Sequence, residues 1–212
     1  MRVIAPDLPG HGFTPPPAGG MTAAAIRDDL APALDTLLTQ PSVVFGNSLG
    51  GLVAIRMAIA EPERVRALIL ASPGGAPMTP DQLDTLLSNF RLASHRDALG
   101  FVDRFQGRSQ ARHVFAWGAR IRMKRKEIRE FVEAIAPEHL LDSDEVSALE
   151  VPTLVFWGSE DEVLPATSLD FFRTHLPGAR IWEPPGYGHA PYLDHLKRFA
   201  GVMDGFLEAH PA

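Results

Sequence analysis

The segment that most constrains the fold is Val43–Ala58, which has a serine near its middle. Its first three residues are β-branched or aromatic and predict a strand, whereas its last seven are good helix formers with a helical spread of apolar side chains. Between them, Gly46 and Gly50 bracket Ser48 at the spacing Gly-x-Ser-x-Gly. Side chains at the bracketing positions would collide with the incoming strand and the outgoing helix. The segment therefore predicts a strand, a sharp turn with Ser48 at its apex, and a helix.

The Gly-x-Ser-x-Gly spacing also has less specific interpretations. An ordinary strand-to-helix turn, or a helix N-terminus that binds an anion, could have the same residues, because glycine and serine are common. The order of the elements that follow Ser48 decides between these interpretations and a nucleophilic serine.

The composition limits the kinds of protein that the chain can be. Its 212 residues are 45% hydrophobic and 22% charged, which predicts one globular domain with room for an inserted subdomain. A net charge of −6 argues against a general nucleic-acid binder, and the lack of cysteine excludes disulfides, a thiol nucleophile and thiolate metal sites. No apolar run reaches the roughly 20 residues of a membrane span, and no signal peptide is visible. We expect a cytoplasmic protein without a membrane partner.

Strands and helices alternate over the first third of the chain. We expect a strand at Arg2–Ala5, a helix that begins at a Thr22 cap and ends near Leu38, and, after Ser48, a strand at Val65–Ala71. The last of these is almost continuously apolar, as in strands that are buried on both faces of a parallel sheet. The alternation predicts the α/β class, with a mostly parallel sheet flanked by helices.

Residues 77–149 do not continue this alternation, because they lack convincing strand patterns and are helical in character. We interpret them as a helical cap inserted between two strands of the core, whose first part is 1–76 and whose second part is 150–212. The substrate pocket is predicted to be lined by aromatic residues of this cap: Phe105, Phe115 and Trp117.

A basic run, Arg120–Lys126, lies within the predicted cap. It could steer an anionic substrate or dock a partner. We favour the simpler interpretation that it is the solvated face of a helix, since Glu127, Glu130 and Glu133 balance it at helical spacings.

Two residues on later loops complete a catalytic set with Ser48. A strand at Val151–Trp157 leads into a loop with Asp161, and a short strand at Ala179–Glu183 leads into a loop with His189. Serine acyl transfer needs a hydroxyl, an imidazole that takes its proton, and a carboxylate that holds the imidazole. Loops that follow parallel strands meet at one edge of the sheet, so these three side chains can converge.

Each position in this set has competitors. Glu160 and Glu162 flank the catalytic aspartate, and we expect them to point away from the histidine. Asp194 and His195 lie in the predicted last helix, on a face interpreted as solvated, and His11 lies in a loop where it would hydrogen-bond its own turn. No His, Asp or Glu cluster has metal-ligand spacing, and no glycine loop has the spacing of a nucleotide site.

Four motifs in this order resemble those of the α/β-hydrolase superfamily, in the branch with a helical cap. They are Asp7–Gly12 (Asp-Leu-Pro-Gly-His-Gly), Gly46–Gly51 (Gly-Asn-Ser-Leu-Gly-Gly), Gly158–Asp161 (Gly-Ser-Glu-Asp) with Pro165, and Gly188–Pro191 (Gly-His-Ala-Pro). The resemblance covers nearly the whole chain and implies nucleophile Ser48, acid Asp161 and base His189. Asn47 beside the serine is similar to carbon–carbon bond hydrolases of aromatic degradation and to esterases, and we place it in the substrate pocket.

The chain departs from the family pattern at its N-terminus. In the family, three strands and a helix precede the strand that begins here at Arg2, and a His-Gly loop supplies one of two amides that bind the oxyanion. The resemblance leaves only the Leu49 amide for that role. It also predicts a gap in the sheet between the strands at Val3 and Val43, and such a gap would expose unpaired backbone and favour self-association. We therefore expect a truncated fold and impaired catalysis.

The sequence thus predicts a serine hydrolase that cleaves an ester or a related acyl bond through an acyl-enzyme on Ser48, without a cofactor or a metal. Its expected partner is a small ester-like substrate. Three alternatives stay open: a carbon–carbon bond hydrolase, an acyl or peracid-forming transferase with the same three residues, and a truncated homologue that only binds a ligand.

Overall fold

The structure is a computed structural model that describes residues 2–106 and 111–210. Its centre is a four-stranded sheet in the order β1-β2-β3-β4, in which every neighbouring pair is parallel. The strands are β1 (Ser42–Ser48), β2 (Val65–Pro73), β3 (Thr153–Phe156) and β4 (Arg180–Trp182). Their register aligns Phe45 of β1 with Ile69 of β2, and Ile69 with Leu154 of β3. The predicted α/β class is confirmed.

Helices precede, connect and follow these strands. Outside the segment between β2 and β3 they are α1 (Ala23–Leu37), α2 (Leu49–Ala60), η1 (Pro62–Arg64), α8 (Ala166–His175), α9 (Pro191–Asp194) and α10 (Leu196–Ala209). The N-terminal capping residue of α1 is Thr22, as predicted, because its hydroxyl oxygen accepts a hydrogen bond from the amide N–H of Ala25 at 3.1 Å. The single last helix that the sequence predicted is instead divided into α9 and α10, since the backbone of His195 leaves the helical region with φ −143° and ψ 73°.

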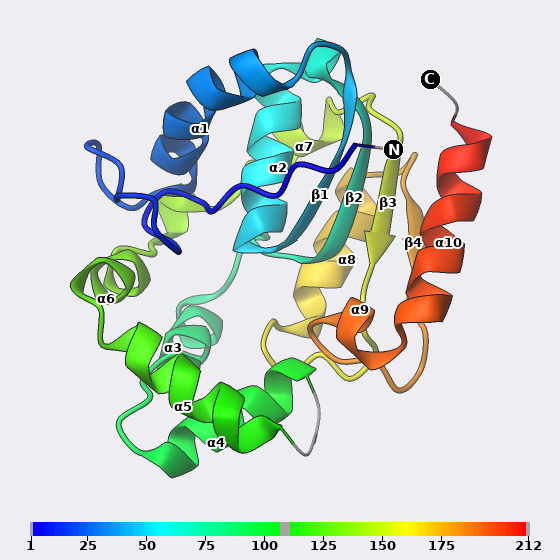
Figure 1. Cartoon of the computed structure of the whole chain (residues 1–212). Coiled ribbons are helices and arrows are strands. Elements are labelled where there is room, and N and C mark those ends of the chain that lie inside the picture. The colour runs from blue at the N-terminus through cyan, green and yellow to red at the C-terminus, as the bar shows by residue number, and fades with distance from the viewer. Residues whose placement is uncertain (1, 107–110, 211–212) are drawn as a thin grey trace.

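The two faces of the sheet are covered by different helices (Figure 1). Successive residues of a strand point to opposite faces. In β2, Ile69 belongs to the apolar cluster that contains Phe199 and Phe206 of α10. Its neighbours Leu68 and Leu70 belong to the larger cluster, which α1, α2 and α8 complete from the other face. Because both faces are covered, the continuous apolar run of β2 has a physical explanation.

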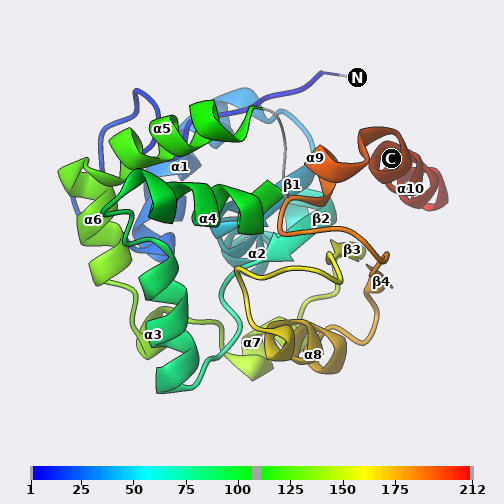
Figure 2. The ribbon, with the colours of Figure 1, turned by 90° about the horizontal axis from the view of Figure 1, so that it is seen from below.

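The segment between β2 and β3 is helical, and its described residues form no strand. It holds α3 (Pro80–Asn89), α4 (His95–Gln106), α5 (Arg112–Met123), α6 (Lys126–Glu133), η2 (Pro137–His139) and α7 (Ser143–Ser147). Figures 1 and 2 show α3 to α6 beyond the carboxyl ends of the strands, on the side where β3 enters its following loop. The division into a cap at 77–149 and two core parts stays a prediction.

The predicted strand at Arg2–Ala5 is wrong. The segment is irregular and the side chain of Val3 is 74% exposed. A strand needs a neighbour for its backbone hydrogen bonds, and this segment does not pair with β1. The predicted gap in the sheet is therefore absent, and β1 is an edge of the described sheet, with Phe45 47% exposed. Self-association through this edge stays a prediction.

Across the part of the chain that the structure describes, no helix combines the length and the apolar character that crossing a membrane requires.

Candidate active site

Ser48 ends β1 and directly precedes α2, at the strand-to-helix turn that the sequence predicted. Its backbone has φ 52° and ψ −118°, a region that residues other than glycine rarely adopt. A Cβ atom at Gly46 would lie 2.2 Å from the carbonyl oxygen of Gly50, so a side chain there would force the turn apart. The second predicted glycine, Gly50, has open space beside it. The fold instead needs Gly51, whose Cβ atom would lie 2.9 Å from Cα of Pro73.

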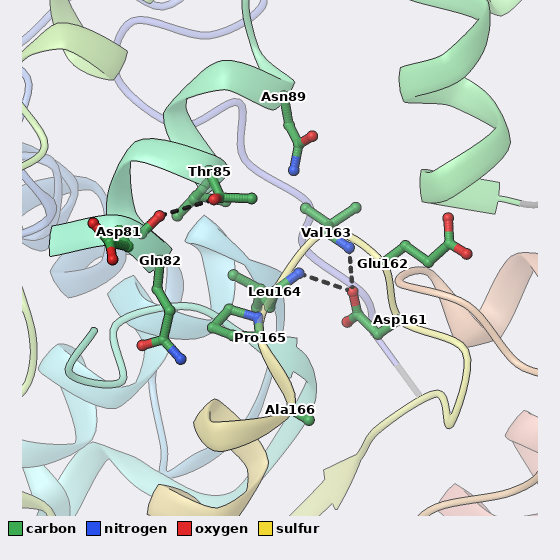
Figure 3. Close-up of a pocket in the computed structure, with 11 residues that line it drawn as sticks. Asp81, Gln82, Thr85, Asn89, Asp161, Glu162, Val163, Leu164, Pro165 and Ala166 are labelled. Atoms are coloured by element: carbon green, nitrogen blue, oxygen red, sulfur yellow. Dashed lines mark hydrogen bonds between the residues drawn. The ribbon is translucent and has the colours of Figure 1, made fainter. Parts of the chain in front are cut away.

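Asp161 and His189 form a buried pair at the carboxyl end of the sheet. Oδ2 of Asp161 lies 2.8 Å from Nδ1 of His189, and the two side chains are 1% and 0% exposed. Oδ1 of Asp161 accepts the amides of Val163 at 2.8 Å and Leu164 at 3.0 Å (Figure 3). Both carboxyl oxygens of Asp161 thus have hydrogen-bond partners. Because the amides of its own loop hold the Asp161 carboxylate in place, the carboxylate in turn fixes the orientation of the His189 ring.

The protonation of this pair follows from its surroundings. Burial by itself would raise the pKa of Asp161, but the hydrogen bond and charge of His189 and the two backbone amides outweigh it and hold that pKa below its ordinary value. The carboxyl group is therefore ionised at neutral pH and has no proton to donate. A proton between the two groups then lies on Nδ1 of His189, and in the neutral imidazole this tautomer leaves Nε2 with the lone pair that a general base requires.

Nε2 of His189 is buried and has no hydrogen-bond partner within residues 2–106 and 111–210. The Ser48 hydroxyl therefore does not hydrogen-bond to it in this structure. The two residues are nevertheless neighbours, because Asn47, which precedes the serine, donates from Nδ2 to the carbonyl oxygen of His189 at 3.2 Å. Hydrogen bonds between catalytic groups are often long in ligand-free enzymes and tighten when substrate binds.

The side-chain amide of Asn47 acts as a brace between parts of the protein, and its predicted place in the substrate pocket stays a prediction. Its Nδ2 also donates to the carbonyl oxygen of Ala71 at 2.8 Å, and its Oδ1 accepts the hydroxyl of Tyr192 at 3.3 Å. Burial raises the pKa of Tyr192, so its hydroxyl keeps the proton that it donates. With both ends of the amide occupied, Asn47 ties β1, β2 and the His189 loop together. Tyr192 had no signal in the sequence, since its partner lies 145 positions away.

Asp194 also has a role that the sequence analysis missed. It was interpreted as part of a solvated helix face, but its Oδ2 accepts the amide of Gly188 at 2.8 Å. This bond fixes the loop immediately before His189. The break between α9 and α10 places Asp194 at the end of a short helix, from which it reaches back to the loop.

Phe105 is the one predicted pocket aromatic that the described structure places against the site. Its ring meets the imidazole of His189 edge-on, with 5.2 Å between the ring centroids. Its carbonyl oxygen accepts the amide of Ala190 at 3.2 Å. The C-terminal end of α4 therefore packs directly on the base and shields it from water.

Phe115 and Trp117 are exposed in this structure, and their predicted role in the pocket stays a prediction. Both are on α5, where their side chains are 52% and 65% exposed. The buried position on this helix belongs to Ala116. Two large rings that lie beside this alanine cannot share its inward direction, because successive helix residues are 100° apart.

A cavity of about 380 Å³ lies between α3 and the loop that carries Asp161 (Figure 3). Its walls are mostly apolar near Leu86, Val163 and Leu164, and Asn89 adds a polar group. Neither Ser48 nor His189 lines it. Of the three predicted catalytic residues, only Asp161 lines this cavity.

The competing residues take other positions. Glu160 and Glu162 are exposed, and the partner of His189 is Asp161. Nδ1 of His11 lies 3.2 Å from the carbonyl oxygen of Pro9, so this histidine bonds its own turn, as predicted. Burial is the main reason that the pKa of His11 is lowered. Within the described ranges, no three His, Asp or Glu side chains form a group that could hold a metal ion.

The comparisons with known proteins decide the family. Residues 1–202 match the model of the alpha/beta hydrolase family. The chain belongs to this family. The predicted superfamily is thereby confirmed, and the strand, turn and helix around Ser48 are those of an alpha/beta hydrolase.

Two relatives of this alpha/beta hydrolase have named activities. A pimeloyl-[acyl-carrier protein] methyl ester esterase of Aromatoleum aromaticum is 31% identical over 96% of this chain and 86% of the relative. A 2-hydroxymuconate semialdehyde hydrolase of Pseudomonas putida is also 31% identical, over 97% of this chain and 76% of the relative. Both names describe hydrolases, and they support hydrolase activity for this chain.

The fold agrees with that of solved structures. A 2-hydroxy-6-oxo-6-phenylhexa-2,4-dienoate hydrolase from Rhodococcus superimposes with a TM-score of 0.79, at 19% identity, over 93% of this chain and 76% of the other. At this level of identity the likeness shows the alpha/beta hydrolase fold alone.

Proposed function

We propose that this alpha/beta hydrolase is a serine hydrolase that cleaves an ester or a related acyl bond through an acyl-enzyme on Ser48. The observation that carries the proposal is the buried pair of Asp161 and His189, joined at 2.8 Å. The pair leaves Nε2 of His189 as an acceptor, and the Asn47 brace keeps it next to the strained turn that presents Ser48.

In the proposed reaction, Nε2 of His189 takes the hydroxyl proton of Ser48 while Oγ bonds to the carbonyl carbon of the ester. The imidazolium then gives this proton to the leaving alcohol as the C–O bond breaks. Water attacks the acyl-enzyme with the same two proton transfers and releases the acid. Asp161 stays ionised throughout and stabilises the imidazolium.

The amide of Leu49 is the proposed donor to the oxyanion. Leu49 is the first residue of α2, and the N–H groups of a first helical turn have no acceptor within the helix. They point along the positive end of the helix dipole, which favours the negative charge that develops on the carbonyl oxygen. The donor therefore needs no side chain and is fixed by the same turn as the nucleophile.

A fluorophosphonate probe tests the nucleophile without knowledge of the substrate. We expect labelling of the full chain, its loss in Ser48→Ala, and its loss in His189→Ala with an unchanged circular dichroism spectrum. His195→Ala is the matched control, because this histidine packs against the ring of Tyr187 at 4.8 Å and not against the pair. Labelling of His189→Ala at the wild-type rate would refute the assignment of the base.

The role of the carboxylate is tested by removing its charge but not its shape. We expect Asp161→Asn to lower turnover of an activated ester by on the order of 10⁴, because asparagine would stabilise the wrong imidazole tautomer. The exposed neighbour offers a control, and Glu162→Gln should keep most of the activity. Equal losses in the two variants would show that the effect is not specific to the pair.

The relatives suggest two substrate classes for the same three residues. The name of the Aromatoleum relative favours a methyl ester of a carboxylic acid, and that of the Pseudomonas relative favours carbon–carbon cleavage of a hydroxymuconate semialdehyde. We place the ester first, because that relative is matched over more of its own length. Turnover of medium-chain methyl esters without turnover of the semialdehyde would support this choice, and the reverse result would overturn it.

A further inference from the structure

Helix α5 presents its apolar side to solvent. Val114, Phe115, Trp117 and Ile121 are 70%, 52%, 65% and 49% exposed, and we call these four residues the α5 ridge. Positions 114, 117 and 121 are spaced three and four apart and therefore lie on one helix face. Apolar groups gathered in this way on a protein surface mark a site of interaction.

The side of α5 that faces the rest of the protein carries a buried alanine and two arginines. Ala116 is fully buried, while Arg112 and Arg120 are partly buried and bonded. Arg112 pairs with Asp103 at 2.9 Å, and Nη2 of Arg120 donates to the carbonyl oxygen of Ala93 at 3.1 Å. The inward side of α5 thus combines these two arginines with Ala116, Ala119 and Met123, which pack against an apolar cluster with α4. Its two aromatic rings, Val114 and Ile121 stay outside.

The ridge lies in the most basic part of the chain. The stretch Arg104–Lys126 contains eight Lys and Arg residues, and all 26 Asp and Glu residues of the chain lie outside it. In the described structure Arg122 and Lys124 make no ion pair, and Lys126 makes one with Glu130 at 3.5 Å on the surface. Two cations that make no ion pair in the described structure, Arg122 and Lys124, therefore adjoin the C-terminal end of the ridge, in a protein whose net charge is −6.

We propose that the α5 ridge docks on the surface of an anionic lipid bilayer, which replaces the expectation from the sequence that the protein has no membrane partner. Aromatic and aliphatic side chains on one face, next to Lys and Arg, are the composition of helices that lie in the plane of a membrane interface. The cations would meet the lipid phosphates while the ridge enters the headgroup region. The acidic remainder of the chain would be repelled, so the protein would dock in one orientation.

A second copy of the chain fits this surface less well. A two-fold interface brings the same patch of both subunits together, and here it would place the cations Arg122 and Lys124 of the two copies close to one another. An anionic surface satisfies both the charge and the apolar area.

Docking through α5 would also place the candidate site near the membrane. α4 and α5 pack side by side, as both views show (Figures 1 and 2). The end of α4 carries Phe105, whose ring contacts His189. A substrate with a lipid-like tail could thus pass from the bilayer to this end of the fold.

Vesicle binding by the full chain tests the proposal. The vesicles are phosphatidylcholine alone, or phosphatidylcholine with about one third phosphatidylglycerol. Brominated acyl chains report depth, because they quench tryptophan only on contact, and Trp117 is 65% exposed whereas Trp157 is 3% exposed. We expect sedimentation and quenching with the anionic vesicles, release in about 0.5 M NaCl, and no binding to phosphatidylcholine alone.

Three variants make this test specific. Val114→Gln with Ile121→Gln should lower the anionic-vesicle partition coefficient by about tenfold or more, because both side chains are removed from the apolar contact. Arg122→Gln with Lys124→Gln should lower it at low salt only. Leu196→Gln is the matched control, since Leu196 is 66% exposed on α10 but adjoins no comparable basic stretch. Equal melting temperatures would show that all variants fold.

Several results would overturn the proposal. They are an absence of sedimentation with anionic vesicles at low salt, equal binding to both vesicle types, and an equal loss in the Leu196 control. A dimer in sedimentation velocity that the Val114 and Ile121 variant abolishes would assign the ridge to a second copy. Binding in Ser48→Ala should match the wild type, so docking can be judged even if the proposed hydrolysis is not observed.

Discussion

Helices α2 and α5 are both 12 residues long, yet they have opposite relations to the rest of the protein. α2 buries seven residues between the sheet and α1, whereas α5 buries Ala116 alone and exposes two aromatic rings. A helix that is apolar on every side needs cover on every side, and α2 has it. α5 packs Ala116, Ala119 and Met123 inward and turns its largest apolar side chains outward. α2 therefore holds Ser48 from within the core, whereas α5 carries the proposed docking surface.

The largest expected effect on stability is that of a substitution at Gly46, in the turn that precedes α2. Gly46→Ala should lower the free energy of unfolding by more than about 3 kcal/mol, because its Cβ would overlap the backbone of Gly50 and force the turn to move. Fluorophosphonate labelling of Ser48 should fall with it. Chemical denaturation and labelling of the same sample measure the two effects. A variant of wild-type stability would mean that the turn is not as tight as the structure describes.

A matched pair of isoleucines compares the two helices directly. Ile55 on α2 is 0% exposed and Ile121 on α5 is 49% exposed. Ile55→Ala should cost about 3 kcal/mol of unfolding free energy through lost burial and a cavity, and Ile121→Ala less than about 0.5 kcal/mol. Urea denaturation of both variants measures the difference. Similar losses of unfolding free energy in the two variants would contradict the different exposure of the two isoleucines. They would show that other parts of the chain cover the α5 ridge.

The dependence of stability on pH should differ between Asp161, at the carboxyl end of the sheet, and Asp97, on helix α4. The pKa of Asp161 is below its unfolded value in the folded state, so its contribution to stability is present above about pH 4 and is lost as pH falls through the folded pKa. The difference in melting temperature between the wild type and Asp161→Asn should therefore become smaller below about pH 4. Asp97→Asn on α4 is the comparison, since that carboxylate is bonded to Ser94 at the surface. We expect it to shift the melting temperature less at every pH.

A small gain in stability is expected from a substitution on α5. A Cβ at Gly118 would meet nothing within 4 Å, so Gly118→Ala should raise the free energy of unfolding by roughly 0.5–1 kcal/mol through helix propensity alone. Thermal unfolding is sensitive enough to detect this change. A loss of stability would indicate that the backbone of α5 needs the freedom of glycine.

The features that could be predicted from the sequence are those that local chemistry specifies. The strand, turn and helix around Ser48 follow from residues adjacent in the chain, and the alternation of strands and helices specifies the fold class. The order Ser48, Asp161, His189 also follows from the sequence, because loops after parallel strands meet at one edge. The contact of Asp161 with His189 is present in the structure.

The features that could not be predicted depend on partners distant in sequence. Arg2–Ala5 has the composition of a strand but lacks a neighbour to pair with. Asn47 lies beside the nucleophile, yet its amide is occupied by groups from β2, the His189 loop and Tyr192. The outward direction of Trp117 depends on which face of α5 its arginines anchor. Gly50 and Gly51 are indistinguishable in the sequence, and only the approach of Pro73 separates them.

The Asn47 brace has a consequence for the order in which the molecule is built. Its bond to the strand beside it spans 24 positions and can close early, whereas its bonds to the His189 loop and to Tyr192 span 142 and 145. On a ribosome, β1 and α2 can pair with β2 while most of the chain is still unsynthesised. The hydroxyl of Ser48 would then lie in a preformed turn before His189 is synthesised, so acylation of Ser48 in the cell would report that the chain had been translated past the His189 loop.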